Sequence, residues 1–445
     1  MVLENEAPVA RTAGLSPRQR RMVAGGAIGT LMEYYDYYLY GLASATVFPS
    51  VFFPDESATV GTLASFASFA VGFLLRPLGG ILFGYVGDRF GRKATLMITV
   101  VGMGISTAAI GLIPPTSAIG LAAPILLLAF RMLQGLFVGG EMGGAASLVV
   151  EHAPTGRRGL FGALLISGAG IANVASAGLM AALGAGSASF FMNWGWRIPF
   201  VFAFVLAIVA VVLRARLEES EEFKTYTAQL ELGQTRRRFP LRDAFRHPKN
   251  AILGILIGLP QSIASYVVLT FGLAFIVSKG TQAQVGFIGT MIVGILQIFA
   301  APMWGLLSDR FGRRRVYIAG CIGFAVLVYP SFLLFGTDVS VLIWLGMVIG
   351  FVIPGVAMQG TLQTMLCEMF DVEARTTGVN IGYQISNTLG GGFAPLIAAA
   401  LVAAFGSVWP VIAYVAVICL IGVIGTAYAS LRPDVEEPVR LHALA

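Results

Sequence analysis

Long runs of apolar residues fill most of the chain, and short polar stretches separate them. Each run has roughly 20 residues or more, which is the length that a helix needs to cross a hydrocarbon core of about 30 Å. The pattern therefore predicts an all-α integral membrane protein with twelve transmembrane helices. We expect these spans near residues 22–48, 60–86, 95–115, 119–150, 159–183, 196–214, 250–278, 283–306, 316–336, 340–365, 377–404 and 408–431.

Composition and charge agree with a membrane setting. The chain is 57% hydrophobic and 12% charged, with a mean hydropathy of +0.81, whereas a soluble domain carries about 25% charged residues. The basic residues gather in loops expected on one side, at residues 18–21, 89–93, 157–158, 214–249 and 310–315. Such an asymmetry is typical of cytoplasmic loops. We therefore expect both termini in the cytoplasm, and the net charge of +6 requires no nucleic-acid partner.

The residue types that build most catalytic and metal centres are scattered along the chain. Cys321, Cys367 and Cys419 have neither metal-ligand nor disulfide spacing, and the histidines fall in expected loops or tails. We expect no metal, no cofactor and no enzymatic activity. A membrane sensor would carry a signalling domain, and the sequence shows no such domain.

A long polar stretch at residues 215–249 divides the twelve spans into two halves of six. Its charge runs are typical of a solvated linker. The predicted organisation is a cytoplasmic tail, a six-helix half, a cytoplasmic linker, a second six-helix half and a second cytoplasmic tail, at residues 1–21, 22–214, 215–249, 250–431 and 432–445.

The two halves repeat each other. Residues 84–92 read G-Y-V-G-D-R-F-G-R and residues 305–313 read G-L-L-S-D-R-F-G-R, both in the loop between the second and third span of their half. After the fourth span of each half, a glutamate precedes an arginine by the same distance, at Glu151 and Arg158 and again at Glu368 and Arg375. Duplicated halves are typical of transporters in which one half rocks against the other around a site near the midplane.

These paired loops on a six-plus-six plan resemble the major facilitator superfamily. The sequence is more closely similar to its metabolite:proton symporter family, and within it to the shikimate transporter branch. The motifs that carry the resemblance lie at residues 33–41, 76–93, 131–145, 193–200, 309–318 and 378–393. The resemblance implies a major facilitator fold and proton-coupled transport.

The repeated loops are candidates for a conformational latch. An acid or a base at the membrane face is stable when it is paired or hydrated, and such pairs can hold one conformation and break in another. The resemblance transfers this gating role to both loops, and the glutamate–arginine echoes can join the same networks. The candidate gating residues are Gly84, Asp88, Arg89, Gly91, Arg92, Glu151, Arg158, Gly305, Asp309, Arg310, Gly312, Arg313, Glu368 and Arg375.

The ionisable residues that lie well inside the spans are Glu33, Asp36, Arg76, Arg131 and Glu141, all in the first half. Such residues are functional candidates, because each costs about 2.5–3.5 kcal/mol at the bilayer centre. Helix rise places Asp36 and Arg131 at similar depths, so we expect them to pair. Arg76 can pair with Glu33 or Glu141, or join the first two spans. Glu141 can release protons or bond between helices.

An Asp36–Arg131 pair suggests a proton-coupling mechanism. Burial disfavours a charged carboxylate and a nearby arginine favours it, so protonation of Asp36 would free Arg131 for a substrate anion. The alternative is a permanent structural pair. Glu33 can extend the polar cluster or bond to tyrosine hydroxyls. The candidate proton-coupling residues are Asp36, Glu33, Arg131 and Glu141.

Neutral polar groups from the second half are expected to face these charges. Amides and hydroxyls opposite one charged cluster suit a small hydroxylated or keto carboxylate, although a single amide is more often an interhelical bond. Pro260 and Pro354 mark positions where helices can flex. The candidate substrate-binding residues are Arg131, Tyr37, Tyr40, Gln134, Gln261, Tyr266, Gln359, Gln363, Tyr383, Gln384 and Asn387.

The function predicted is uptake of a small organic acid, such as shikimate or a related mono- or dicarboxylate, by proton symport and alternating access. The alternatives are a proton/substrate antiporter and a transporter of a zwitterionic osmolyte. Antiporters of the superfamily carry a proline in a glycine-rich motif of span five, and residues 159–174 lack one. The partners expected are the organic anion, protons and the lipid of a bacterial inner membrane, with the protein as a monomer.

Overall fold

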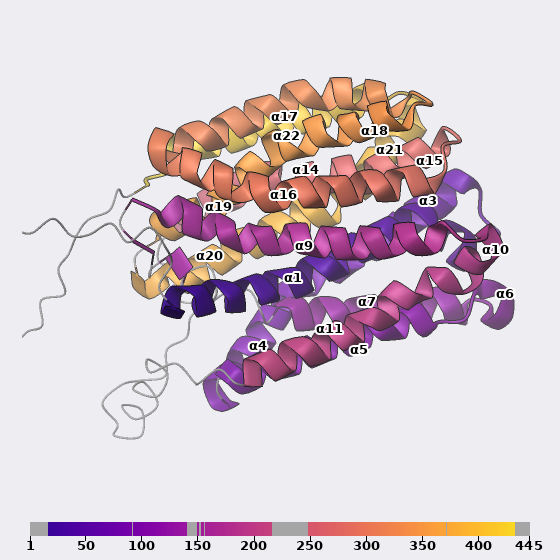
Figure 1. The fold of residues 1–445 in the computed structure, drawn as a ribbon, viewed down its shortest axis with the longest axis horizontal. Helices are drawn as coiled ribbons and strands as arrows, with labels where there is room; N and C mark the ends of the chain where they lie inside the picture. Colours follow the sequence, from indigo (N-terminus) through magenta and orange to yellow (C-terminus); the bar gives the residue numbers. More distant parts are fainter. Residues whose placement is uncertain are drawn as a thin grey trace, which may run out of the picture.

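The computed structural model describes residues 17–90, 92–139, 149–150, 153–154, 156–215, 248–370 and 372–431, with the backbone alone for residues 17–25, 84, 87–90, 92–94, 214–215 and 372–377. The regular structure in this part of the chain is helical throughout. The long helices lie roughly parallel to one axis, and the two halves of the chain lie beside each other (Figure 1).

Most of the described part of the first half consists of long helices joined by short turns. Its elements are α1 (Pro17–Thr46), α2 (Phe48–Phe52), α3 (Ala58–Leu74), α4 (Arg76–Phe90), α5 (Arg92–Leu112), α6 (Thr116–Ile119), α7 (Ala122–Gly139), α9 (Arg158–Gly184), α10 (Ala188–Phe190), the π-helical η1 (Phe191–Gly195) and α11 (Arg197–Ala215).

The second half has the same character, with π-helical segments inside three of its spans. Its elements are α14 (Pro248–Ser265), η2 (Tyr266–Phe271), α15 (Gly272–Ser278), α16 (Ala283–Phe311), α17 (Arg313–Phe335), α18 (Ser340–Met347), η3 (Val348–Val352), α19 (Pro354–Met369), α20 (Val372–Ser386), η4 (Asn387–Gly392), α21 (Ala394–Phe405) and α22 (Trp409–Tyr428).

The helices confirm the membrane-spanning pattern expected from the sequence. Within the described residues, ten stretches are long and apolar enough to cross a membrane, and a bent pair, Ala188–Gly195 with Arg197–Leu213, raises the number to as many as eleven. They coincide with the second to twelfth expected spans. The first expected span corresponds to α1, which has 30 residues. It is less apolar because it carries two acids and a run of tyrosines.

The π-helical segments of the second half were not expected from the sequence, and one has a clear local cause. Pro354 has no backbone N–H, so it cannot donate to the carbonyl four residues earlier. The wider turn of η3 ends at Val352, two residues before Pro354. Single π-turns inside helices are often found at functional sites. Here η2 begins at Tyr266 and η4 begins at Asn387, and both residues are candidate substrate ligands.

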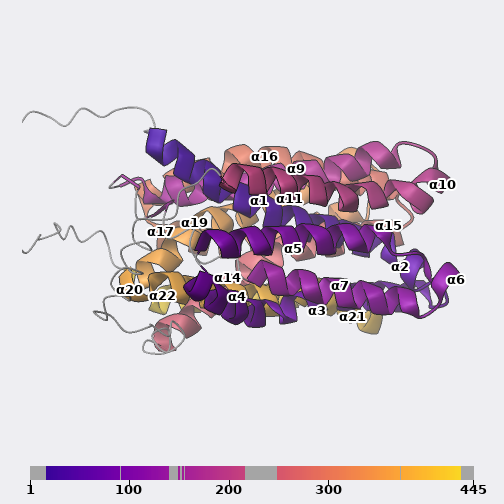
Figure 2. The same ribbon diagram turned by 90° about the horizontal axis from the view of Figure 1, so that it is seen from below.

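Glycines let α7 approach α3 and α4 at backbone distance. A Cβ added to Gly135 would collide with the carbonyl of Gly72, and one added to Gly139 would collide with the carbonyl of Arg76. Gly79 of α4 meets the carbonyl of Leu136 in the same way. Figure 2 shows α7 running beside both helices. This close approach brings Arg76 and Arg131 toward the same part of the bundle.

The two halves are joined mainly by α9 and α16, which pack along most of their lengths (Figure 1). Here too small residues form the contact, since a Cβ on Gly170 would lie 2.9 Å from the carbonyl of Gly294. On its other side α9 packs against α1. The carboxylates of α1 therefore lie near the surface where the halves meet.

We expect Gly135→Ala to destabilise the protein, because the added methyl group has no space against the backbone of Gly72. Overpacking of this kind costs about 1–3 kcal/mol. A lowered thermal unfolding midpoint in detergent would show it. Gly61→Ala is the matched control, since its nearest neighbour would be at an ordinary 3.5 Å. Equal midpoints for both variants would show that α7 does not approach α3 as described.

Candidate functional site

Four charged side chains are buried together in the first half. Glu33 and Asp36 come from α1, Arg76 from the start of α4 and Arg131 from α7, and none is more than 2% exposed. Arg131, Gln134 and Val138 lie on the buried stripe of α7, as their spacing predicts. Burial at this level removes water as a partner, so each charge depends on protein groups or a ligand.

Asp36 is held by three groups from two other helices. Thr107 of α5 donates to Oδ1 over 2.6 Å, and Nη1 of Arg131 lies 3.4 Å from Oδ2. The side-chain amide of Gln134 donates to Oδ1 as well, and it also lies 2.7 Å from the Thr107 hydroxyl. The predicted Asp36–Arg131 pair is therefore present, at a distance longer than a normal charge-assisted hydrogen bond.

Thr107 is a functional candidate that the sequence analysis missed. It lies on α5, is 1% exposed and also donates to the carbonyl of Met103 one turn earlier. Threonines inside apolar helices usually bond to their own backbone. The sequence therefore contains no signal that separates Thr107 from other hydroxyl residues of the spans.

Arg131 is only partly satisfied by Asp36 and Gln134. Its Nη1 donates to both, while Nε and Nη2 have no hydrogen-bond partner in the described part of the chain. The guanidinium carbon lies 4.0 Å from the centroid of the Tyr40 ring, whose hydroxyl is 2.8 Å from Ser68. The N–H groups on these two nitrogens of Arg131 therefore remain available to an anion.

Glu33 lies one turn before Tyr37 on α1, and the Tyr37 hydroxyl donates to its Oε1. The bond matches one of the two roles expected for Glu33, that of a partner for tyrosine hydroxyls. Tyr37 in turn packs against the guanidinium of Arg76, 4.0 Å from its ring centroid. Glu33, Tyr37 and Arg76 thus form a continuous group beside the Asp36 network.

Arg76 is expected from the sequence to pair with Glu33 or Glu141 or to join the first two spans, and its pairing with Glu33 stays a prediction. Its Nε and Nη1 have no hydrogen-bond partner among the described residues, and the side chain is 1% exposed. The other suggested partner, Glu141, lies outside the described residues. The guanidinium carbon lies 3.4 Å from the centroid of the Phe73 ring.

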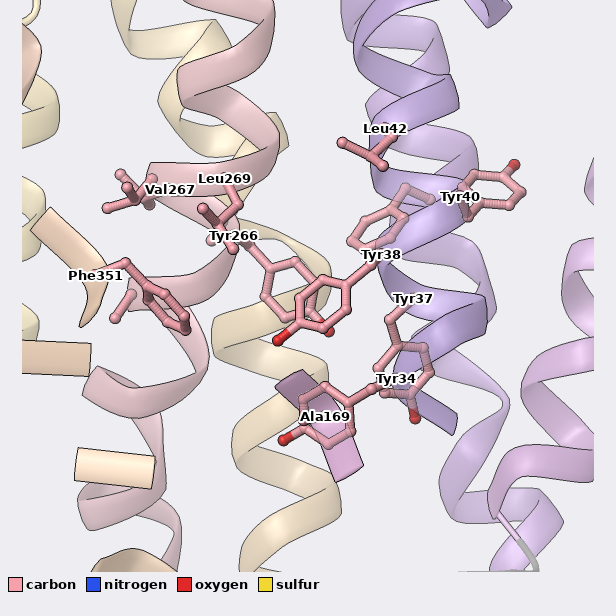
Figure 3. Close-up of a cluster of buried hydrophobic side chains, with 14 of the residues drawn as sticks. Tyr34, Tyr37, Tyr38, Tyr40, Leu42, Ala169, Tyr266, Val267, Leu269 and Phe351 are labelled. Carbon is pink, nitrogen blue, oxygen red and sulfur yellow. The ribbon is translucent and has the colours of Figure 1, made fainter. Parts of the chain in front are cut away.

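Tyrosines from both halves meet across the interface (Figure 3). Tyr34 of α1 and Tyr383 of α20 are joined by a 2.9 Å hydrogen bond between their hydroxyls. Tyr266 extends from η2 toward α1, and its ring centroid lies 5.4 Å from that of Phe69 and 5.8 Å from that of Phe73. These contacts place Tyr266 and Tyr383 opposite the charged cluster, as expected.

The candidate amides of the second half fall into two groups. Gln359 accepts from Gln297 over 2.8 Å and donates to Ser265 over 3.1 Å. Asn387 accepts from Ser262 over 3.1 Å and donates to the carbonyl of Tyr383 over 3.0 Å. Both amides are thus engaged in bonds within their own half.

The remaining amides keep unused polar atoms. Gln384 is 5% exposed, and both its side-chain oxygen and nitrogen have no partner in the described structure. The side-chain oxygen of Gln261 is also without a partner there. Gln363 is buried one turn after Gln359 on α19. Gln384 is therefore the amide with most capacity for a ligand.

At the end of the bundle where α9 begins, the second D-R-F-G-R loop reaches the first half. The carboxylate of Asp309 accepts from the backbone N–H groups of Gly159 and Leu160, over 2.8 and 2.9 Å. These are orphan donors of a helix N-terminus, where negative charge is favoured. Arg313 lies 3.1 Å from Asp309 and 2.5 Å from Glu368.

Of the other gating candidates, the structure describes only some. Gly312 has a φ of 91°, which suits the tight turn between α16 and α17. Arg310 is exposed and packs on Phe311 outside this network. The carbonyl of Arg158 accepts from Thr364, and Gly305 packs against Gly159. Several candidates lie outside the described residues. They are Glu141, Glu151 and Gly91 and, beyond their backbone, Gly84, Asp88, Arg89, Arg92 and Arg375.

Two family models match the chain in tandem. The model described as sugar (and other) transporter matches residues 22–239, and the Major Facilitator Superfamily model matches residues 251–443. The join between them falls near the end of the predicted linker.

Curated proteins from bacteria are similar over most of the chain. The shikimate transporter of Escherichia coli (strain K12) is 39% identical, covering 91% of this chain and 93% of that protein. The proline/betaine transporter of the same organism is 35% identical, covering 91% of this chain and 82% of that protein.

Solved structures share the fold at lower sequence identity. The D-xylose-proton symporter superposes with a TM-score of 0.70 at 19% identity, covering 92% of this chain and 96% of that chain. A partially occluded inward-open form of the xylose transporter XylE from E. coli gives a TM-score of 0.69 at 18% identity. The match covers 93% of this chain and 97% of that chain. The chain thus belongs to the major facilitator superfamily, and it is a membrane transporter and not an enzyme.

Proposed function

We propose that the protein is a proton-coupled symporter that takes up a small organic anion, such as shikimate or a related carboxylate, across a bacterial inner membrane. The observation that carries the proposal is the buried Asp36–Arg131 contact, at 3.4 Å with two Arg131 nitrogens unused in the described structure. An arginine held by a long contact and offering free donors can exchange one carboxylate for another.

The coupling follows from the chemistry of this pair. When Asp36 binds a proton it loses its charge, and Arg131 can turn its N–H groups to a substrate carboxylate. When Asp36 releases the proton, its carboxylate competes for Arg131 and the substrate leaves. Thr107 and Gln134 hold Asp36 in place in both states, because each can also bond to a protonated carboxyl.

The contacts between the halves supply the alternating access. We place the end with Asp309 in the cytoplasm, because the basic loops gather there. Asp309 bonded to the start of α9 closes that end, while Thr388 bonded to the carbonyl of Phe73 and Tyr34 bonded to Tyr383 join the halves near the site. Opening toward one side breaks the bonds of Asp309 to α9, and opening toward the other breaks the bonds between the halves near the site.

A zwitterionic osmolyte is the second candidate substrate. It is favoured by the 35% identical proline/betaine relative and by the buried rings around the site, since aromatic faces bind quaternary ammonium groups. Uptake assays with shikimate, succinate, proline and glycine betaine in proteoliposomes, with a pH dye inside, distinguish the two. Proton entry driven by an organic acid supports the leading proposal, and entry driven only by proline or betaine supports the second.

We expect Asp36→Asn to abolish proton-driven accumulation, lowering it at least 10-fold, because the amide cannot exchange a proton. Exchange of labelled for unlabelled substrate at equilibrium should persist, since that reaction needs no net proton movement. Asp55→Asn is the matched control, because Asp55 is exposed in a turn. Normal proton coupling in Asp36→Asn would show that Asp36 is structural.

We expect Asp309→Ala to favour opening of the end that Asp309 closes. The variant loses two charge-assisted bonds to α9, each worth about 1.5–3 kcal/mol, so the population of separated halves should rise about 10-fold or more. Distances between spin labels at Arg157→Cys and Arg315→Cys, in a chain without its native cysteines, measure that population. Asp338→Ala is the control, since Asp338 is exposed in a loop; identical distance distributions in both variants would exclude the latch.

A further inference from the structure

Arg76 is a buried positive charge without an assigned role. It is 1% exposed, and Nε and Nη1 have no hydrogen-bond partner in the described residues. Its carbon lies between two rings, 3.4 Å from the centroid of Phe73 and 4.0 Å from that of Tyr37. Stacking on aromatic faces offsets part of the cost of burying an arginine, but it leaves the N–H groups of Nε and Nη1 unsatisfied. An arginine stays charged when buried, so this group calls for an anion.

Two described carboxylates of α1 near Arg76 have other hydrogen-bond partners. Arg76 is followed by Pro77, and the backbone of Gly139 on α7 packs against the Arg76 carbonyl. Glu33, on the tyrosine side, accepts a hydrogen bond from the Tyr37 hydroxyl. Asp36 is held by Thr107, Gln134 and Arg131.

A second unsatisfied group, the Gln384 side chain, comes from the second half near the junction of α3 and α4, where Arg76 and Pro77 lie. Pro77 has no N–H, so the carbonyl of Phe73, four residues earlier, lacks its helical donor. Thr388 of η4 lies 3.1 Å from this carbonyl, and its hydroxyl also bonds over 2.8 Å to the carbonyl of Gln384. The Gln384 side chain, which has no partner for either polar atom in the described structure, therefore belongs to the turn of α20 that adjoins Phe73.

We propose that Arg76 is the primary binding group for the substrate carboxylate, with Gln384 bonding to a neighbouring hydroxyl or carboxylate oxygen from the other half. The proposal rests on the proposed function and deepens it. Arg76 would determine affinity for the anion, while Arg131 remains the partner that Asp36 gains and loses during proton coupling.

The two arginines are close enough to act on one small molecule. Both guanidiniums pack near the Phe73 ring, with centroid distances of 3.4 Å for Arg76 and 5.8 Å for Arg131, so their carbons are at most about 9 Å apart. A carboxylate held at Arg76 can thus meet Arg131 once Asp36 is protonated. Nε and Nη1 of Arg76 have no hydrogen-bond partner among the described residues, so they can hold the anion in either protonation state of Asp36.

The test compares binding of each acid with binding of its fully esterified methyl ester, which has no carboxylate. The probes are shikimate, succinate and glycine betaine, which all carry a carboxylate, and the methyl esters of the three acids. We expect Arg76→Gln to weaken binding of the recognised acid at least 10-fold and to leave binding of its ester unchanged. Arg76→Lys should recover part of the loss, and Arg314→Gln, an exposed arginine on α17, should bind as the wild type does.

Ester binding shows that each variant is folded, and proton coupling separates this proposal from the proposed function. Residual transport by Arg76→Gln at high substrate concentration should keep its proton dependence, with a raised KM. If Arg76→Gln keeps the wild-type ratio of acid affinity to ester affinity, Arg76 does not bind the substrate carboxylate. That outcome overturns the role of Arg76 and leaves the proposed coupling at Asp36 intact. Wild-type protein that binds none of the three carboxylates overturns both proposals.

Discussion

A charge inside a lipid-embedded helix bundle must find its partner within the bundle, and this constraint organises the first half of the molecule. Asp36 and Arg131 come from helices far apart in the chain, and they meet only because α7 can lie against α3. The glycines at that contact serve the charges directly. A Cβ on Gly72 would lie 2.5 Å from Nε of Arg131, so the arginine occupies space that any other residue would fill. The close packing of these helices and the placement of the buried arginine therefore depend on the same glycines.

The fold followed from the sequence because lipid permits few solutions. Apolar runs of spanning length must be helices, so the second to twelfth spans could be placed from hydropathy alone, and α1 could be included because its charges lie in an apolar run. The π-helical segments could not be placed in the same way. They depend on Pro354 in one case, and η2 and η4 begin at Tyr266 and Asn387 with no residue that marks them in the sequence.

The candidate site was predictable where it is charged and unpredictable where it is neutral. Charged residues are rare in spans, so Asp36 and Arg131 were evident, and helix rise gave their common depth. Thr107 was not evident, because hydroxyl residues are common in spans and most of them bond to their own helix. The sequence also could not show that Asn387 is engaged by Ser262 while Gln384 is unsatisfied, since that depends on how α20 and η4 are rotated against α14.

The division of charge between the halves bears on how a proton and a substrate could cross together. The four buried charges of the described site belong to the first half, and the second half faces them with tyrosines and amides. Protonation of Asp36 therefore changes interactions within one half only, and it does not by itself alter the contacts that hold the halves together. A substrate that bonds to an arginine on one side and to Gln384 on the other would replace contacts such as the one between Thr388 and Phe73. In that arrangement the anion, rather than the proton, links the chemistry of the site to the movement of the halves, and a proton without its anion has no means of driving the transition.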